Sequence, residues 1–232
     1  MLANMQNKDI RTLGYVLRRT NYGEADRILN LITPAGKISV MAKGVRKEKS
    51  KLAGGVEMFT LSEYNVHFGK GDFGTLTGAK MVQHYGEIMK DLARIELASL
   101  ILKKVSMAAD SSDSAEFFEI VDQSLKSINK NVDLRKVEIW YLLNLVKVMG
   151  EEVNLYRDMN GERLLSEQRY DWNGREAVFM MNENGRYGAD EIKLMRLTTT
   201  VKLDVIERVK TDDLVITNVL DLARIASGIQ KF

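Results

Sequence analysis

Alternating apolar and polar residues run through the first eighty positions and predict β-strands. The alternation covers Thr12 to Arg19 and returns in runs at 27–33, 38–42, 59–68 and 74–82. Within the fourth run, Phe59 and Leu61 share one phase whereas Tyr64, Val66 and Phe68 share the other. A change of phase inside a strand indicates a β-bulge, which bends the strand. Five curved strands with glycines at the bends predict a small, partly open barrel.

From Glu87 onward, apolar residues recur at helical spacing. The first helix is expected from Ile88 to about Ala109, and the second starts at Asp113, whose spacing to Glu116 is that of a capping box. A third runs from Leu134 to Met149, with Asp133 as N-cap and Gly150 after its end. Its apolar residues surround the helix axis, so it is expected to be the central helix of a bundle. Further helical runs are expected at 192–197, 203–209 and 220–229.

Residues 151–188 interrupt the helical pattern. They contain three Asn-Gly pairs, beginning at Asn160, Asn173 and Asn184, each of which fits a type I′ hairpin turn. The fold class is therefore α+β: a five-stranded barrel at 1–82, then a mainly α-helical domain at 83–232 that carries a small hairpin-rich insertion at 151–188.

Charge is distributed unevenly along the 232 residues. The whole chain has a formal net charge of +2. Residues 1–80 hold 13 Lys and Arg against 7 Asp and Glu, whereas residues 81–232 hold 21 against 25. This asymmetry is expected when one domain meets nucleic acid and the other meets protein. The polar N-terminus and the lack of any long apolar run predict a soluble, cytoplasmic protein without membrane contact.

The most basic stretch lies between the third and fourth predicted strands. From Lys43 to Lys51, five of nine residues are Lys or Arg and one, Glu48, is acidic. Such a loop can hold a phosphate backbone by charge alone. A solvated surface loop is the alternative reading, because Lys clusters often have no ligand.

The surrounding motifs resemble one family. The chain reads YGEAD-R from Tyr22, T-x-x-G-K from Thr33, AKG-x-R-K-x-K-S-x-L-x-G from Ala42 and G-x-L-T from Gly74. This ordered succession resembles the N-terminal domain of the RecO family, bacterial recombination mediators that bind and anneal single-stranded DNA. The resemblance implies an OB-fold barrel, which the pattern alone does not separate from an SH3-like barrel. It also implies recombinational repair with RecR and the C-terminal tail of single-strand-binding protein as partners, at the nucleoid.

The candidate DNA-binding residues are the cations of the basic loop and of the neighbouring strands. They are Arg18, Arg19, Lys37, Lys43, Arg46, Lys47, Lys49, Lys51 and Lys70. Tyr22 and Tyr64 are candidates for stacking on bases.

In the RecO family, the position of 151–188 commonly holds a small insertion in which four cysteines bind zinc. This chain has no cysteine, so we expect no metal, no cofactor and no disulfide. The folding energy of the missing zinc is expected to be offset by hairpin geometry and by packing of Trp172 and Phe179.

Nothing in the sequence points to an enzyme. The two histidines, His67 and His84, belong to no catalytic motif and are expected at a surface or an interface. The glycines at 69–74 lie between strands and lack the Gly-x-x-x-x-Gly-Lys pattern, so neither an NTPase nor any small-molecule substrate is expected. Binding of structured RNA, and scaffolding through an acidic partner, are the alternatives to DNA annealing.

The acidic second half is expected to dock protein independently of the basic loop. An apolar groove edged by a few cations could accept a short acidic tail. Lys103 and Lys104 are the basic pair considered for it. The alternative is that they favour a helix C-terminus by their charge.

Overall fold

The computed structural model describes residues 8–70, 73–111 and 114–228. The chain divides into two compact units, Met1–Lys130 and Asn131–Phe232. The predicted division at 82 falls two residues before the last barrel strand ends at His84. The packing boundary falls at 130 because the first two helices pack on the barrel. Whether the predicted domains 1–82 and 83–232 fold independently stays a prediction.

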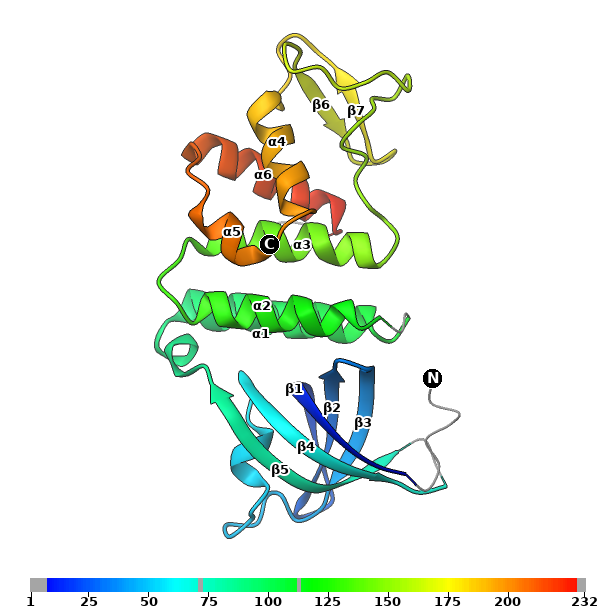
Figure 1. Ribbon diagram of the computed structural model, residues 1–232, viewed down its shortest axis with the longest axis vertical. Coiled ribbons are helices and arrows are strands. Elements are labelled where there is room, and N and C mark those ends of the chain that lie inside the picture. Colours follow the sequence, from blue (N-terminus) through cyan, green and yellow to red (C-terminus); the bar gives the residue numbers. More distant parts are fainter. Residues whose placement is uncertain (1–7, 71–72, 112–113, 229–232) are drawn as a thin grey trace. The chain divides into compact units, whose positions relative to one another are not determined.

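Five strands form the barrel of the first unit (Figure 1): β1 (Lys8–Tyr22), β2 (Asp26–Thr33), β3 (Gly36–Ala42), β4 (Thr60–Phe68) and β5 (Gly74–His84). They pair around the barrel in the order β1-β2-β3-β5-β4, and β4 pairs in turn with β1. All of these pairings are antiparallel except the one between β3 and β5, which is parallel and covers two residue pairs. The five predicted strands and the fold class are confirmed.

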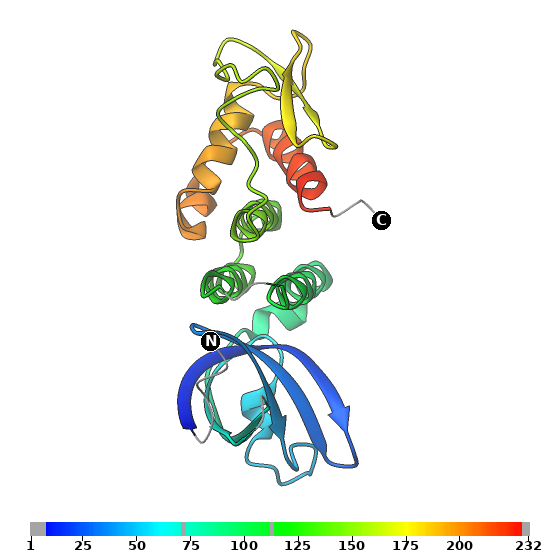
Figure 2. The same ribbon diagram turned by 90° about the vertical axis from the view of Figure 1, so that its right-hand side faces the viewer.

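Alternation places one face of each strand in the barrel interior. Figure 2 shows the strands curving around this interior. The fully buried core includes Leu29, Leu31, Val40, Val56 and Tyr64. The bulge predicted in the fourth strand is wrong, because β4 pairs with β1 without interruption from Phe68 to Ser62. The two register shifts between β4 and β5 instead leave the extra residues, Thr77 and Val82, on β5. A further bulge, between Val16 and Arg18 of β1, was not predicted.

Two helices, α1 (Leu92–Ala108) and α2 (Glu116–Ile128), cover one end of the barrel (Figure 1). Tyr15 of β1 is buried against them, with its ring 5.6 Å from that of Phe118. Its hydroxyl donates to Asp122 at 2.7 Å, and Lys126 donates to the other oxygen of the same carboxylate at 2.6 Å. These contacts explain why the barrel and the helix pair form a single compact unit.

The starts of the first two helices differ from prediction. Residues Gly86–Lys90 form a 3₁₀ turn, and α1 begins after Asp91, whose carboxylate accepts a hydrogen bond from the backbone N–H of Arg94. The predicted start at Ile88 is wrong because the buried Ile88 belongs to that separate turn. The predicted cap Asp113 lies outside the described residues. At the start of α2, the hydroxyl of Ser114 accepts from the backbone N–H of Glu116.

The second unit surrounds one helix. It contains α3 (Leu134–Val148), α4 (Ala189–Thr198), α5 (Leu203–Arg208) and α6 (Asp213–Ala226). α3 packs against the other three, which confirms its predicted central position. Asp133 caps it as predicted, and Gly150 follows it with a positive φ of 80°. Arg224 of α6 binds Glu138 of α3 through two hydrogen bonds of 2.7 and 2.8 Å.

The insertion at 151–188 holds a hairpin of β6 (Tyr170–Asn173) and β7 (Val178–Met181), packed around Phe179. The ring of Phe179 lies edge-on to Trp172, Tyr187 and Tyr170, with centroids 4.9, 5.8 and 6.2 Å away. The predicted packing of Trp172 and Phe179 is confirmed. Hydrophobic and aromatic burial therefore holds this module together.

The type I′ turns predicted at the Asn-Gly pairs are wrong. A type I′ turn needs a positive φ at both central residues, and none of the three asparagines has one. Four residues, 174–177, separate β6 from β7, and the left-handed position in this loop is Ala177, with φ 53°. At Asn173 the side-chain oxygen instead accepts from the backbone N–H of Arg175.

Candidate nucleic-acid interface

The basic loop is fastened to the turn between β1 and β2. The backbone N–H of Gly44 donates to the carboxylate of Asp26 at 2.6 Å, and the backbone N–H of Arg46 donates to the carbonyl of Ala25 at 2.9 Å. The Arg46 guanidinium also reaches the carbonyl of Gly23 at 3.3 Å. Because Gly44 has φ 62°, the chain can turn back at this point at little steric cost. Two motifs that are separated in sequence, YGEAD-R and AKG-x-R-K, therefore form one structure.

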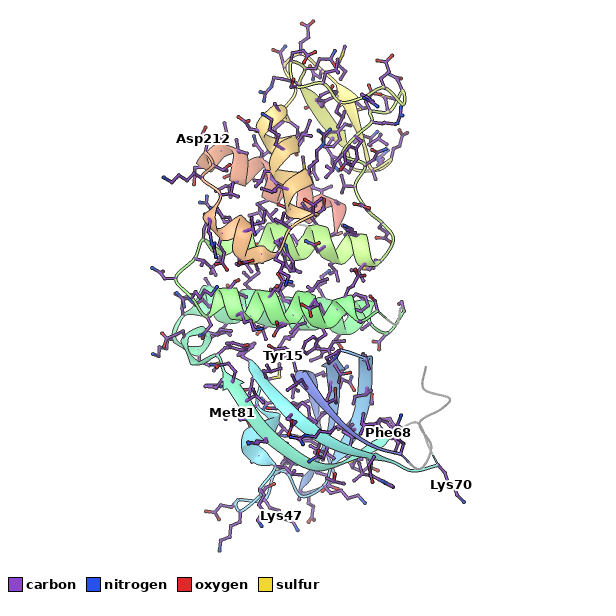
Figure 3. The ribbon with its side chains drawn as sticks, in the orientation of Figure 1. Tyr15, Lys47, Phe68, Lys70, Met81 and Asp212 are labelled. Atoms are coloured by element: carbon purple, nitrogen blue, oxygen red, sulfur yellow. The ribbon has the colours of Figure 1, made fainter. Side chains whose placement is uncertain are left out.

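The cations of the loop face outward. Val45 is buried in the barrel core, which anchors the loop between Gly44 and Arg46. Lys43, Arg46, Lys47, Lys49 and Lys51 are all exposed. Figure 3 shows Lys47 pointing away from the barrel, at the end opposite α1 and α2. Close spacing of five exposed cations on a fixed loop favours binding of a polyanion.

The outer face of β1, β2 and β3 adjoins this loop. Residues paired across neighbouring strands point to the same side of the sheet. Arg18 pairs with Asn30, and Asn30 with Ser39, while Thr20 pairs with Ile28, and Ile28 with Met41. Since Leu29 and Leu31 point into the core, these two rows lie on the outside. Arg18 is exposed there, as expected for a binding residue, and Tyr22 is 56% exposed at the end of the same strand.

Sequence reasoning did not identify Ile28 and Met41 as candidate contact residues of this face. Both are half-buried on the outer face, where they offer apolar contact between the cations. The signal that could have found them is the alternation of β2 and β3, in which Ile28 and Met41 occupy the phase opposite to the core residues. Asp26 was also missed as a residue that holds the loop.

Three predicted cations lie elsewhere. Arg19 is half-buried and forms a 2.8 Å ion pair with Glu57, so it holds the segment before β4. The Lys37 side chain is 10% exposed and binds the carbonyl of Ser106 at 3.0 Å and the carboxylate of Asp110, which fastens the β2–β3 turn to α1. Lys70 is exposed on the β4–β5 loop, at a different place on the barrel from Lys47 (Figure 3). The structure thus brings the loop cations and Arg18 to one region, and leaves Arg19, Lys37 and Lys70 outside it.

Tyr64 cannot stack on a base. It is fully buried in the barrel core, and its hydroxyl donates to the carbonyl of Gly55 at 2.9 Å. Its prediction as a stacking residue is wrong because Tyr64 shares the inward phase of Val66 and Phe68 in β4. Burial also raises the pKa of its hydroxyl well above the usual value.

Each of the two histidines lies close to one polar partner. His67 is exposed and its Nδ1 lies 2.8 Å from the carboxylate of Asp9, whereas Nδ1 of His84 lies 3.2 Å from the hydroxyl of Thr60. Within residues 8–70, 73–111 and 114–228, no three His, Asp or Glu side chains are grouped as metal ligands. In the same part of the chain, the helices are too short or too polar to span a membrane.

Lys103 and Lys104 lie before the last turn of α1, so their predicted alternative role at the helix C-terminus is wrong.

The strand order and the accessible basic loop define an OB-fold domain, a class of barrel that commonly binds oligonucleotides. Comparison with known proteins agrees with this class. The family model described as "Recombination protein O N terminal" matches residues 5–85. Several relatives carry the name DNA repair protein RecO.

Three of these relatives show the extent of the similarity. The protein from Dehalococcoides mccartyi is 30% identical over 70% of this chain and 65% of its own length. That from Bacillus cytotoxicus is 32% identical over 59% of this chain and 56% of its own length, and that from Listeria welshimeri is 27% identical over 82% and 77%. The chain thus covers less than two thirds of the first two relatives. Over these shares of its length the chain is similar to the RecO family, and residues 5–85 match the model of that family's N-terminal domain.

Proposed function

We propose that this protein binds single-stranded DNA, anneals complementary strands and acts in recombinational DNA repair. The observation that carries the proposal is the fixed basic loop, in which five exposed cations stand beside the outer face of β1, β2 and β3. Each phosphate that such a cation neutralises releases a counterion, so the loop supplies affinity without base specificity. The names of the relatives support a role in DNA repair.

Single strands fit this surface better than duplexes because bases can reach it. Tyr22 is exposed on the same outer face of the sheet as the half-buried Ile28 and Met41. An aromatic ring can stack on an unpaired base, and apolar side chains can cover its edges. A duplex would hide its bases and use the cations alone. No covalent chemistry is needed for annealing, so the proposed protein is a mediator and not an enzyme.

The test is the salt dependence of binding. Anisotropy of a labelled single strand should give a slope of log affinity against log salt of roughly −3 to −4 for about five contacts. Between 50 and 200 mM salt, the affinity should fall on the order of a hundredfold. The variant with Arg46, Lys47, Lys49 and Lys51 all changed to Glu should bind weakly to every sequence, with a flatter slope.

A charge-matched control separates the loop from overall charge. Changing Lys103, Arg175, Lys202 and Lys210 to Glu reverses four exposed cations elsewhere and should leave the slope unchanged. Equal losses in the two variants would contradict the proposed site. Competition by structured RNA at a lower concentration than single-stranded DNA would favour the RNA-binding alternative instead.

The proposed partners are RecR and the C-terminal tail of single-strand-binding protein, as the similarity to the RecO family implies. The acidic charge of residues 81–232 supports protein docking on that part of the chain, independently of the basic loop. Because α1 and α2 pack on the barrel, the test uses the full chain and not a fragment starting at 83. A tail peptide should bind the unaltered chain and the four-Glu loop variant equally well. Loss of peptide binding in the loop variant would contradict separate sites.

A further inference from the structure

A pocket of about 570 Å³ lies in the second unit, between the insertion at 151–188 and α4. This volume is within the range of sites that hold small organic ligands. Its floor contains Leu164 and Ile192, which are 8% and 4% exposed. Tyr156 and Leu165 also line it and remain 60% and 43% exposed, so they present apolar surface to an incoming ligand.

Positive charge surrounds this pocket. Arg157, Arg163, Lys193 and Arg196 line it, against the single carboxylate of Glu167. This local excess is opposite in sign to the balance of residues 81–232, where acidic residues outnumber basic ones by four. Cations around an apolar surface, on an otherwise acidic segment, favour a ligand that combines a flat apolar part with negative charge.

Two of the four cations are fixed in place. Arg196 donates to the carbonyl of Leu155 through Nε at 2.9 Å and Nη2 at 2.7 Å, and its guanidinium lies 4.9 Å from the ring centroid of Tyr156. Arg157 donates to the carbonyl of Gly161 at 2.5 Å. The Tyr156 ring is therefore supported by a cation and still largely exposed.

The other two cations are available to a ligand. Lys193 is 70% exposed, and the carboxylate of Asp190 is 3.7 Å from its ammonium group. Arg163 is exposed. Both can turn toward an anion without breaking a short ion pair.

We propose that this pocket binds one nucleotide of a second single strand. The base stacks on Tyr156 and contacts Leu165, while Arg163 and Lys193 bind its phosphate. An exposed aromatic ring beside cations recognises a base and its phosphate together, and guanidinium groups match the geometry of phosphate oxygens. This inference rests on the proposed function, because a protein that anneals two strands gains by holding both of them.

The first experiment looks for binding that does not depend on the basic loop. In the four-Glu loop variant, a labelled single strand should still bind at 50 mM salt, with a slope of roughly −1.4 for the two contacts of Arg163 and Lys193. Adding Arg163→Glu and Lys193→Glu should lower this residual affinity at least tenfold. Adding Arg175→Glu and Lys202→Glu, two exposed cations of the same unit outside the pocket, should not.

The second experiment measures annealing. With the basic loop intact, Arg163→Glu together with Lys193→Glu should slow the annealing of two complementary oligonucleotides at least tenfold, whereas the Arg175→Glu and Lys202→Glu pair should not. Tyr156→Leu keeps apolar volume but removes the ring, so it should slow annealing severalfold. Tyr156→Phe, which keeps the ring, should anneal faster than Tyr156→Leu, and circular dichroism should show the same fold in every variant.

Several outcomes would overturn the inference. Residual binding that is absent, or that survives reversal of Arg163 and Lys193, would exclude the pocket as a second strand site. Tyr156→Leu that anneals normally would exclude stacking. An acidic peptide ending in leucine that binds the pocket, while oligonucleotides do not, would assign it to a protein partner. If the unaltered chain binds no single strand at all, the proposed function fails together with this inference.

Discussion

The carboxylate of Asp26 accepts a 2.6 Å hydrogen bond from the backbone N–H of Gly44, and so holds an acidic residue against the start of the basic loop. Placed beside a polyanion, a carboxylate by itself opposes binding. Its position next to five cations is explained by the contact it makes, which fixes where the loop leaves β3.

Asp26→Ala should weaken binding of single-stranded DNA about fivefold, although the change removes a negative charge. The loop keeps all its cations but loses the hydrogen bond to a charged acceptor, a contact of about 1.5–3 kcal/mol. Glu24→Ala, in the same turn and exposed, removes an equal charge without touching the loop and should strengthen binding slightly. Anisotropy titrations of both variants check the opposite signs. Stronger binding by both would show that charge alone matters at this turn.

Gly44→Ala should lower the free energy of unfolding by about 1 kcal/mol. A side chain at this position has room, since the nearest atom is Cδ of Lys47 at 3.6 Å, but φ 62° is strained for any residue with a Cβ. Gly54→Ala is the matched control, because it meets nothing within 4 Å and its φ lies outside the left-handed region. Urea unfolding should show no loss of stability in that control. Equal stabilities of the two variants would contradict the strain argument.

Unfolding at high pH should depend on Tyr15. Burial, followed by its hydrogen bonds to Tyr85 and Asp122, raises the pKa of the Tyr15 hydroxyl far above its ordinary value of 10. The unfolded chain therefore loses this proton first, and the free energy of unfolding falls as pH rises above 10, by about 1.4 kcal/mol per pH unit for one group.

Tyr15→Phe removes that titration. Its stability should therefore fall less steeply with pH than that of the unaltered chain between pH 10 and 11. At pH 7 the variant should be less stable by about 1–3 kcal/mol, because Asp122 loses a buried donor. Urea unfolding at several pH values gives both numbers. Parallel pH curves for the two proteins would refute the role of this hydroxyl.

The insertion should be held by its aromatic rings and contain no stoichiometric zinc. Phe179→Ala should cost about 3–5 kcal/mol within this module, since the ring is fully buried among Tyr170, Trp172 and Tyr187. Chelators should leave the Tm of the unaltered chain unchanged, and elemental analysis after dialysis should find no zinc. One zinc per chain would disprove this expectation.

Sequence reasoning located the strands because each strand of the barrel buries one face, which leaves an alternating pattern. It shortened β1, whose ends at 8–11 and 20–22 are mostly exposed and carry little apolar signal. It found the loop cations from local charge. It misassigned Tyr64 because alternation along β4 does not by itself say which of the two faces is buried. It misassigned Lys37 because the partners of that side chain lie far along the sequence, at the end of α1.

The contacts of Lys37 and Tyr15 also decide where the family's N-terminal region can be cut or joined in a variant protein. The sequence similarity described by the family model ends at residue 85, but the partners of these two side chains, Asp110 and Asp122, lie beyond that limit. A fragment cut at residue 82 would leave a buried hydroxyl and a nearly buried ammonium without their carboxylates, and would expose the apolar surface that α1 and α2 cover. Chimaeras that exchange barrels between relatives should therefore be joined near residue 130, so that each barrel brings its own pair of helices.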